Sequence, residues 1–202
     1  MTQRFLQLFP AFRFRNYRIF FGAQFISLIG TWMQMVSQGY LAYELTHSAL
    51  WVGIAAAAGH IPSTIFALIG GTLVDKYPKK DILRITQFIQ FVLASFLGVL
   101  VITSNIDLYT LMLLSFAMGT VNAINQPARI ALPHELVDRE HLHSAIALNM
   151  SMFNSARIIV PAIAGWLIYA FGVGWSFVLN GISCLVPFIA YNFMTWAPHV
   201  YR

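Results

Sequence analysis

Six long apolar segments dominate this sequence. Each approaches or exceeds the roughly 20 residues that an α-helix needs to cross the hydrocarbon core of a membrane. The segments lie at 18–43, 50–74, 82–103, 108–126, 144–171 and 175–195. The sequence therefore predicts an all-α membrane protein, built as a bundle of six transmembrane helices.

The charged residues are too few to cover a water-soluble protein of this size. Only 9% of the 202 residues are charged and 58% are hydrophobic, so the lipid bilayer is the predicted partner. The net charge of +5 comes from bases clustered at the ends of apolar segments, as in membrane proteins, and predicts no nucleic-acid partner. The single cysteine, Cys184, lies inside an apolar segment and predicts no disulfide framework.

The connections at 46–48, 104–107 and 172–174 are short enough to predict helical hairpins, so consecutive spans should run antiparallel. This alternation places nearly all bases on one side of the membrane. The loops on the opposite side contain only three charged or titratable residues, Glu44, His47 and Asp107. The bases on the first side are Arg4, Arg13, Arg15, Arg18, Lys76, Lys79, Lys80, Arg84, Arg129, Arg139 and Arg202. Because basic loops stay in the cytoplasm, both termini are predicted to be cytoplasmic.

We expect three parts along the chain. Arginines alternate with aromatic residues over 1–17, which is typical of an amphipathic segment at the cytoplasmic membrane surface. The six-helix domain is expected to cover 18–196, and 197–202 should begin a cytoplasmic linker.

A compact block of charge, GTLVDKYPKK at 71–80, separates the second and third predicted spans. This segment resembles the signature loop between the second and third helices of major facilitator superfamily transporters, with Pro78 where the family usually has glycine. We call it the signature loop. The resemblance implies the N-terminal half of a transporter with inverted 3+3 helix repeats and a substrate site between two six-helix halves. The second half would come from a missing C-terminal domain, a homodimer or another chain.

Other segments resemble one branch of this superfamily, the enterobactin-exporter group of bacterial exporters. They are RNYR at 15–18, QFISLIGTWMQ at 24–34, NQPAR at 125–129, LPHELV at 132–137, AIALN at 145–149 and FNSAR at 153–157. The resemblance implies a bacterial inner-membrane exporter that moves a small, siderophore-like anion by alternating access, driven by proton entry. Alternatives are multidrug or macrolide efflux, and a non-transporting fragment or membrane interaction partner. No nucleotide-binding or nucleophile motif is present, so neither an enzyme nor a cofactor is predicted.

Polar residues recur at helical spacing in two predicted spans. In the first span they are Gln24, Ser27, Thr31, Gln34 and Gln38, and in the fourth Ser115, Asn122 and Gln126. Residues three and four apart share one helix face. Such a face either lines a water-filled substrate cavity or hydrogen-bonds to neighbouring helices.

Arg157 lies midway along the fifth predicted span, too deep for its side chain to reach the membrane surface. A mid-membrane arginine costs roughly 2.5–3.5 kcal/mol on insertion scales, so function is its default explanation. No acid lies at comparable depth in this chain. We expect Arg157, with Asn154, to face polar groups, cavity water, a carboxylate of the second half or an anionic substrate.

The resemblance implies a cytoplasmic gate at the signature loop. Its residues are Gly71, Asp75, Lys76, Lys79, Lys80 and, at the end of the fourth span, Arg129. Arg129 is expected to pair with Asp75 or Glu135. His60 and Glu44 are the candidates for proton coupling, although His60 also fits a neutral packing role. The loop histidines lack the spacing of a metal site, so no metal is predicted.

Overall fold

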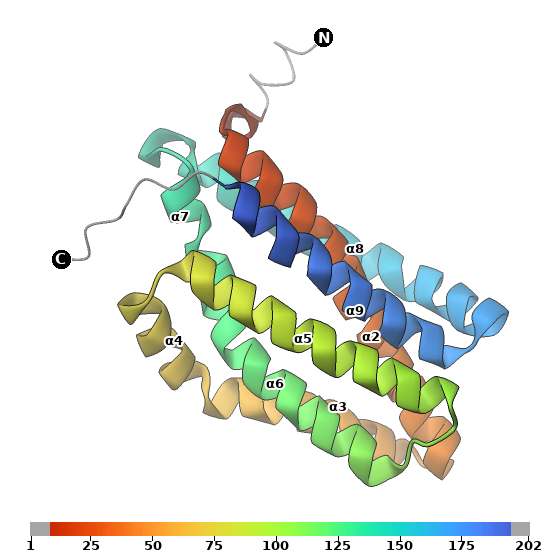
Figure 1. Cartoon of the computed structure of the whole chain (residues 1–202). Coiled ribbons are helices and arrows are strands. Elements are labelled where there is room, and N and C mark those ends of the chain that lie inside the picture. The colour runs from red at the N-terminus through yellow and green to blue at the C-terminus, as the bar shows by residue number, and fades with distance from the viewer. Residues whose placement is uncertain (1–8, 195–202) are drawn as a thin grey trace.

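The computed structural model describes residues 9–194, which form a bundle of helices (Figure 1). The elements are η1 (Pro10–Arg13), α2 (Arg15–Thr46), α3 (Ala49–Ile65), α4 (Ala67–Lys76), α5 (Lys79–Ile102), α6 (Leu108–Ala131), α7 (Pro133–Leu136), η2 (Arg139–His141), α8 (Leu142–Phe171), α9 (Val173–Ala190) and η3 (Tyr191–Phe193). The expectations for 1–8 and for 195–202, which include the linker, lie outside the described residues.

The predicted all-α bundle of apolar, membrane-spanning helices is confirmed within this part of the chain, with five or six spans. Five helical segments, containing α2, α5, α6, α8 and α9, are long and apolar enough to cross a membrane. The pair α3 and α4, which covers the second predicted span, passes the same test together but is bent by 47° at a short break. The fold is therefore an all-α membrane bundle whose second span is broken.

The break in the second span lies at Phe66, whose backbone leaves the helical region at φ −91° and ψ 4°. Pro62, one turn earlier, has no N–H to donate to the preceding turn, so this stretch is already short of one helical hydrogen bond. The sequence predicts a kink at Pro62. The structure places the sharpest bend one turn later, and it directs α4 away from the axis of α3 (Figure 1).

The helix contacts repeat between the first three spans and the last three. The third spans of the two sets, α5 and α9, pack against each other. The first span, α2, packs on α9, just as its counterpart α6 packs on α5. Likewise α3 and α4 pack on α6, and their counterpart α8 packs on α2. Because each set has an odd number of spans, the two sets have opposite topology, which is the predicted inverted 3+3 arrangement.

The base-rich segments gather at one end of the bundle, where η1, the α4–α5 turn, α7 and η3 lie together (Figure 1). A buried cluster ties this end together, and the Tyr17 hydroxyl within it donates to the carbonyl of Ala145 at 2.9 Å. Its members include Ala11, Tyr17, Val74, Leu83, Leu132, Ala145 and Tyr191. The described part of the N-terminal segment is therefore docked on the bundle.

Candidate functional site

The exposed surface of the bundle divides into two chemical kinds. Beyond the first turn of α5, every exposed residue of α5 and α9 is apolar. In contrast, exposed polar residues occur on α2, α3, α6 and α8: Thr31, His60, Asn154 and Arg157 lie well inside their spans, and Gln126 lies near the end of α6. In Figure 1, α5 and α9 lie in front, and α2, α3 and α8 lie behind them. The apolar surface suits lipid, and the polar surface suits water, substrate or another helical unit.

The polar residues of the first span do not share one environment. Gln24, Ser27 and Gln34 are buried, whereas Thr31 is exposed and donates to the Ser27 carbonyl at 2.9 Å. Gln38 is partly exposed and donates to the Ala55 carbonyl of α3 at 2.8 Å. Only part of the predicted stripe is therefore available to a cavity in this structure.

Gln34 belongs to a buried polar cluster between α2, α6 and α9. The Asn180 side-chain amide donates to the Gln34 side-chain oxygen, and Gln34 Nε2 lies 2.7 Å from the Met118 sulfur. Ser183 Oγ donates to the Asn180 carbonyl at 2.8 Å. Asn180 was not among the predicted site residues, although its helical spacing from Ser176 and Ser183 was a usable signal.

Removing one member of this cluster should be more harmful than removing two. Asn180→Leu leaves the Gln34 amide short of a partner inside the bundle and is expected to lower the free energy of unfolding by about 0.6–2 kcal/mol. Adding Gln34→Leu should recover part of this loss, because both polar groups are then gone. SDS-induced unfolding of the parent, the two single variants and the double variant measures the coupling energy between the two residues. Strictly additive losses of stability would contradict a coupling between Gln34 and Asn180.

In the fourth span, the predicted stripe also changes exposure along the helix. Ser115 is buried and donates to the Leu111 carbonyl at 2.7 Å, Asn122 is partly exposed, and Gln126 is exposed. The neighbouring Asn125, which the sequence analysis did not select, is buried and donates to Thr86 Oγ1 of α5 at 2.8 Å. This α6–α5 bond is the counterpart of the α2–α9 bond between Gln34 and Asn180.

Arg157 is exposed at the middle of α8, about 20 Å from either end at 1.5 Å per residue. It makes no ion pair with any residue that the structure describes. Asn154, three residues earlier, is also exposed and shares this side of the helix. The buried seam of α8 is narrow and consists mostly of small residues, Ala145, Met152, Ala156, Val160 and Ala164. Arg157 therefore lies on the outside of the bundle, at the middle of its helix.

The signature loop is a tight connection between α4 and α5. Lys79, at the start of α5, forms an ion pair with Glu135 of α7, so one predicted partner of Arg129 is engaged by a base of the loop itself. Lys80 Nζ donates to the carbonyl of Met194 at 3.4 Å. Arg129 is partly exposed and makes no ion pair with Asp75 or Glu135. The loop thus contacts α7, which follows the fourth span, and Met194, which follows the sixth span.

The other predicted gate residues of the loop are partly or fully exposed. Asp75 and Lys76 are exposed, Gly71 is partly exposed, and the Lys76 ammonium lies 5.6 Å from the ring centre of Tyr77. Asp75 has no ion pair with the residues described here. The predicted gate therefore has one internal ion pair and an exposed acid and base that are free to contact another unit.

The two protonation candidates are both accessible. His60 is exposed on α3, where its backbone carbonyl accepts a hydrogen bond from Thr64 Oγ1 at 3.3 Å. Glu44 is exposed in the last turn of α2, at the opposite end from the signature loop. Within 9–194, no cluster of three or more histidine, cysteine or acidic side chains is arranged to hold a metal ion.

Comparison with known proteins identifies a family for this chain. The model of the transmembrane secretion effector family matches residues 7–201. The staphyloferrin A transporter of Staphylococcus aureus is 25% identical over 84% of this chain, and the enterobactin exporter EntS of Salmonella typhimurium is 27% identical over 91%. The EntS protein of Shigella boydii is 28% identical, also over 91%. No solved structure matches this chain.

The chain spans 43% of the length of each of these three relatives. That share fits one six-helix half of a longer transporter, and the apolar spans make this chain a multi-pass membrane protein. The signature loop between α4 and α5 and the inverted contact pattern of the helices agree with the family match. The chain therefore belongs to the transmembrane secretion effector family of the major facilitator superfamily.

Proposed function

We propose that this chain forms the N-terminal half of an exporter that carries a small anionic molecule of the siderophore type across the bacterial inner membrane. The observation that carries the proposal is Arg157, an exposed cation at the middle of a span without an acidic partner in the described chain. An anionic substrate supplies the missing counter-charge and a charge-assisted hydrogen bond. The names of the staphyloferrin A and enterobactin transporters favour the siderophore class.

The substrate pathway lies along the polar surface. Thr31, Gln126, Asn154 and Arg157 come from three helices and are all exposed, so a second six-helix unit covering this surface would enclose a polar space. The buried residues Gln24, Ser27 and Gln34 support that wall from behind through contacts with α9 and η3. Rocking of the two units would then open this space to either side in turn.

The signature loop acts at the cytoplasmic end of this pathway, with both termini in the cytoplasm. The ion pair of Lys79 with Glu135 fixes the loop to its own half, and exposed Asp75 and Lys76 contact the second half when the cytoplasmic side closes. Proton entry drives export, with His60 and Glu44 as the candidate carriers because each is exposed and titratable.

Transport by everted inner-membrane vesicles tests the proposal. The vesicles carry a protein that joins this chain to a second six-helix unit, and they are supplied with enterobactin or staphyloferrin A. Imposing a proton gradient should cause accumulation of one of them above vesicles without the protein, and an uncoupler should abolish it. Accumulation of a hydrophobic cation or a macrolide, with neither siderophore transported, would instead support drug efflux.

A further inference from the structure

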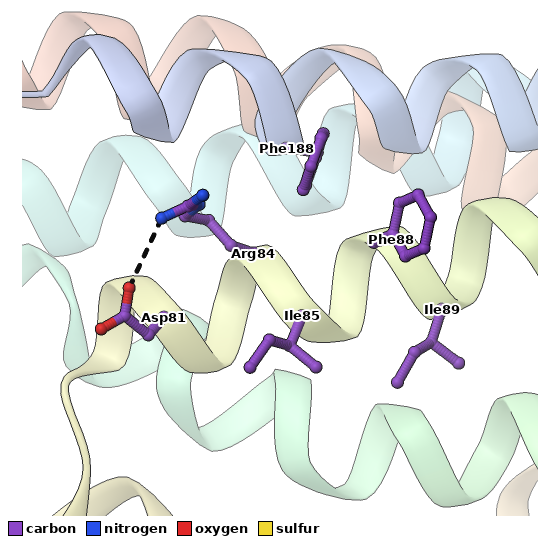
Figure 2. Close-up of a pocket in the computed structure, with 6 residues that line it drawn as sticks. All are labelled: Asp81, Arg84, Ile85, Phe88, Ile89 and Phe188. Atoms are coloured by element: carbon purple, nitrogen blue, oxygen red, sulfur yellow. Dashed lines mark ion pairs between the residues drawn. The ribbon is translucent and has the colours of Figure 1, made fainter.

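Two adjoining grooves run along the lipid-facing side of α5. The larger, about 360 Å³, is lined by Asp81, Arg84, Ile85, Phe88, Ile89 and Phe188. Figure 2 shows Asp81 and Arg84 at one end, Phe88 and Ile89 farther along α5, and Phe188 facing them from α9. The smaller groove, about 170 Å³, shares Ile85 and Ile89 with the larger one. Its other walls include Leu73 of α4 and Tyr77, which directly follows α4.

We propose that these grooves bind one anionic glycerophospholipid, with its phosphate at Arg84 and its two acyl chains along the two sides of the Ile85 and Ile89 ridge. The proposal rests on the chain being a membrane protein and does not depend on export. Apolar grooves on a surface that faces the bilayer are filled by acyl chains, because water gains too few hydrogen bonds there.

The position of Arg84 and its incomplete set of hydrogen-bond partners suit it to bind a phosphate. It follows the first residue of α5 by five positions, or about 8 Å along the helix, which puts it near the level of lipid headgroups. Its Nη1 lies 3.7 Å from Asp81 Oδ1, longer than a charge-assisted hydrogen bond. Its Nε is buried and has no hydrogen-bond partner among the described residues, so only the terminal nitrogens can contact a bound lipid. The side chain is 37% exposed, and a phosphate oxygen would supply the close acceptor that these terminal nitrogens lack.

The surroundings of Arg84 also favour an anion. The start of α5 carries Lys80, has no side-chain cap, and presents the positive end of a 24-residue helix, while the neighbouring Lys79 is neutralised by its ion pair with Glu135. Asp81 is the opposing charge next to Arg84 and competes with the phosphate for its guanidinium. The grooves end in apolar walls, where the Phe88 and Phe188 rings lie 5.5 Å apart between centroids. The site for the headgroup phosphate, at Arg84, thus lies at one end of the apolar grooves that would hold the acyl chains, as in a phospholipid.

Native mass spectrometry of the purified, delipidated chain tests this site. Phosphatidylglycerol and phosphatidylcholine with identical acyl chains are titrated separately, and the anionic lipid is expected to bind about fivefold more tightly. Arg84→Gln should abolish this preference, whereas Arg84→Lys should retain part of it. Asp81→Asn should strengthen phosphatidylglycerol binding, because the competing carboxylate is removed. Arg139→Gln, an exposed base on η2, is the matched control and should change nothing.

Several results would overturn the proposal. One is an unchanged preference in a folded Arg84→Gln chain, and another is an equal loss in the Arg139→Gln control. Asp81→Asn provides an independent arm if Arg84→Gln fails to fold, and no gain in phosphatidylglycerol binding would count against the site. Ile89→Trp, which fills the ridge between the grooves, should weaken both lipids; unchanged binding would show that the chains lie elsewhere. Full competition by water-soluble glycerophosphoglycerol would show that the site takes a soluble anion.

Discussion

In a protein that joins this chain to a second six-helix unit, replacing Arg157 with glutamine is expected to lower export of an anionic siderophore about tenfold or more. The reason is the loss of a charge-assisted hydrogen bond in a site of low dielectric constant. Initial rates of vesicle uptake measure the effect. Arg157→Lys should keep part of the activity, because it retains the charge but loses the planar fork of donors.

The same substitution should not harm folding. Arg157 is exposed and has no ion pair in the described chain, and a mid-membrane arginine is costly to insert. Membrane levels and resistance to SDS should therefore be equal to the parent or higher, so a loss of transport would not reflect misfolding. Arg139→Gln removes an exposed arginine from η2 and should leave export unchanged. Normal export by Arg157→Gln at normal membrane levels would contradict the anion site.

The second large effect is expected at the crossing of α3 and α6. A Cβ atom added to Gly119 would lie 2.2 Å from the carbonyl oxygen of Gly59, which is backbone and cannot rotate away. Gly119→Ala should therefore push the two helices apart and lower the free energy of unfolding by about 1–3 kcal/mol. Separation of the two helices should also weaken the hydrogen bond that Ser63 Oγ donates to the Gly119 carbonyl at 2.9 Å.

Gly53→Ala provides the control for this prediction. Gly53 lies on α3, but a Cβ atom there meets nothing within 4 Å. Alanine favours a helix over glycine by up to about 1 kcal/mol, so this chain should be as stable as the parent or more stable. SDS titration followed by circular dichroism compares the variants. Equal stability of Gly119→Ala and Gly53→Ala would show that the helices do not meet as closely as described.

The architecture was predictable because membrane insertion depends on properties that are local in the sequence. Segment length and apolarity located the spans, and the end of α6 and the start of α9 differ from the predicted boundaries only by a few residues. The signature loop was also recognisable, because its turn is formed by consecutive residues. The depth of Arg157 followed from its position within one helix, without knowledge of any neighbour.

The exposure of each polar residue was not predictable in the same way. Spacing puts Gln24, Thr31 and Gln34 near one another on α2, but only the packing of α9 decides that Gln24 and Gln34 are buried while Thr31 is exposed. Polar spacing did mark Asn180 and Asn125, since Asn180 lies between Ser176 and Ser183 and Asn125 follows Asn122 by three residues, but spacing does not show which polar residues are buried. Their roles arise from partners on other helices, Gln34 and Thr86.

Local properties of the chain were enough to place the apolar segments in order, to gather most of the bases at one end, and to reveal an arginine without a nearby acid in the middle of one segment. Packing between helices set where the second predicted span breaks, that Lys79 engages Glu135, and that Arg84 stands at the end of two lipid-facing grooves. Burial and pairing depend on the surfaces of neighbouring helices, whereas sequence spacing fixes only the face that each helix can offer.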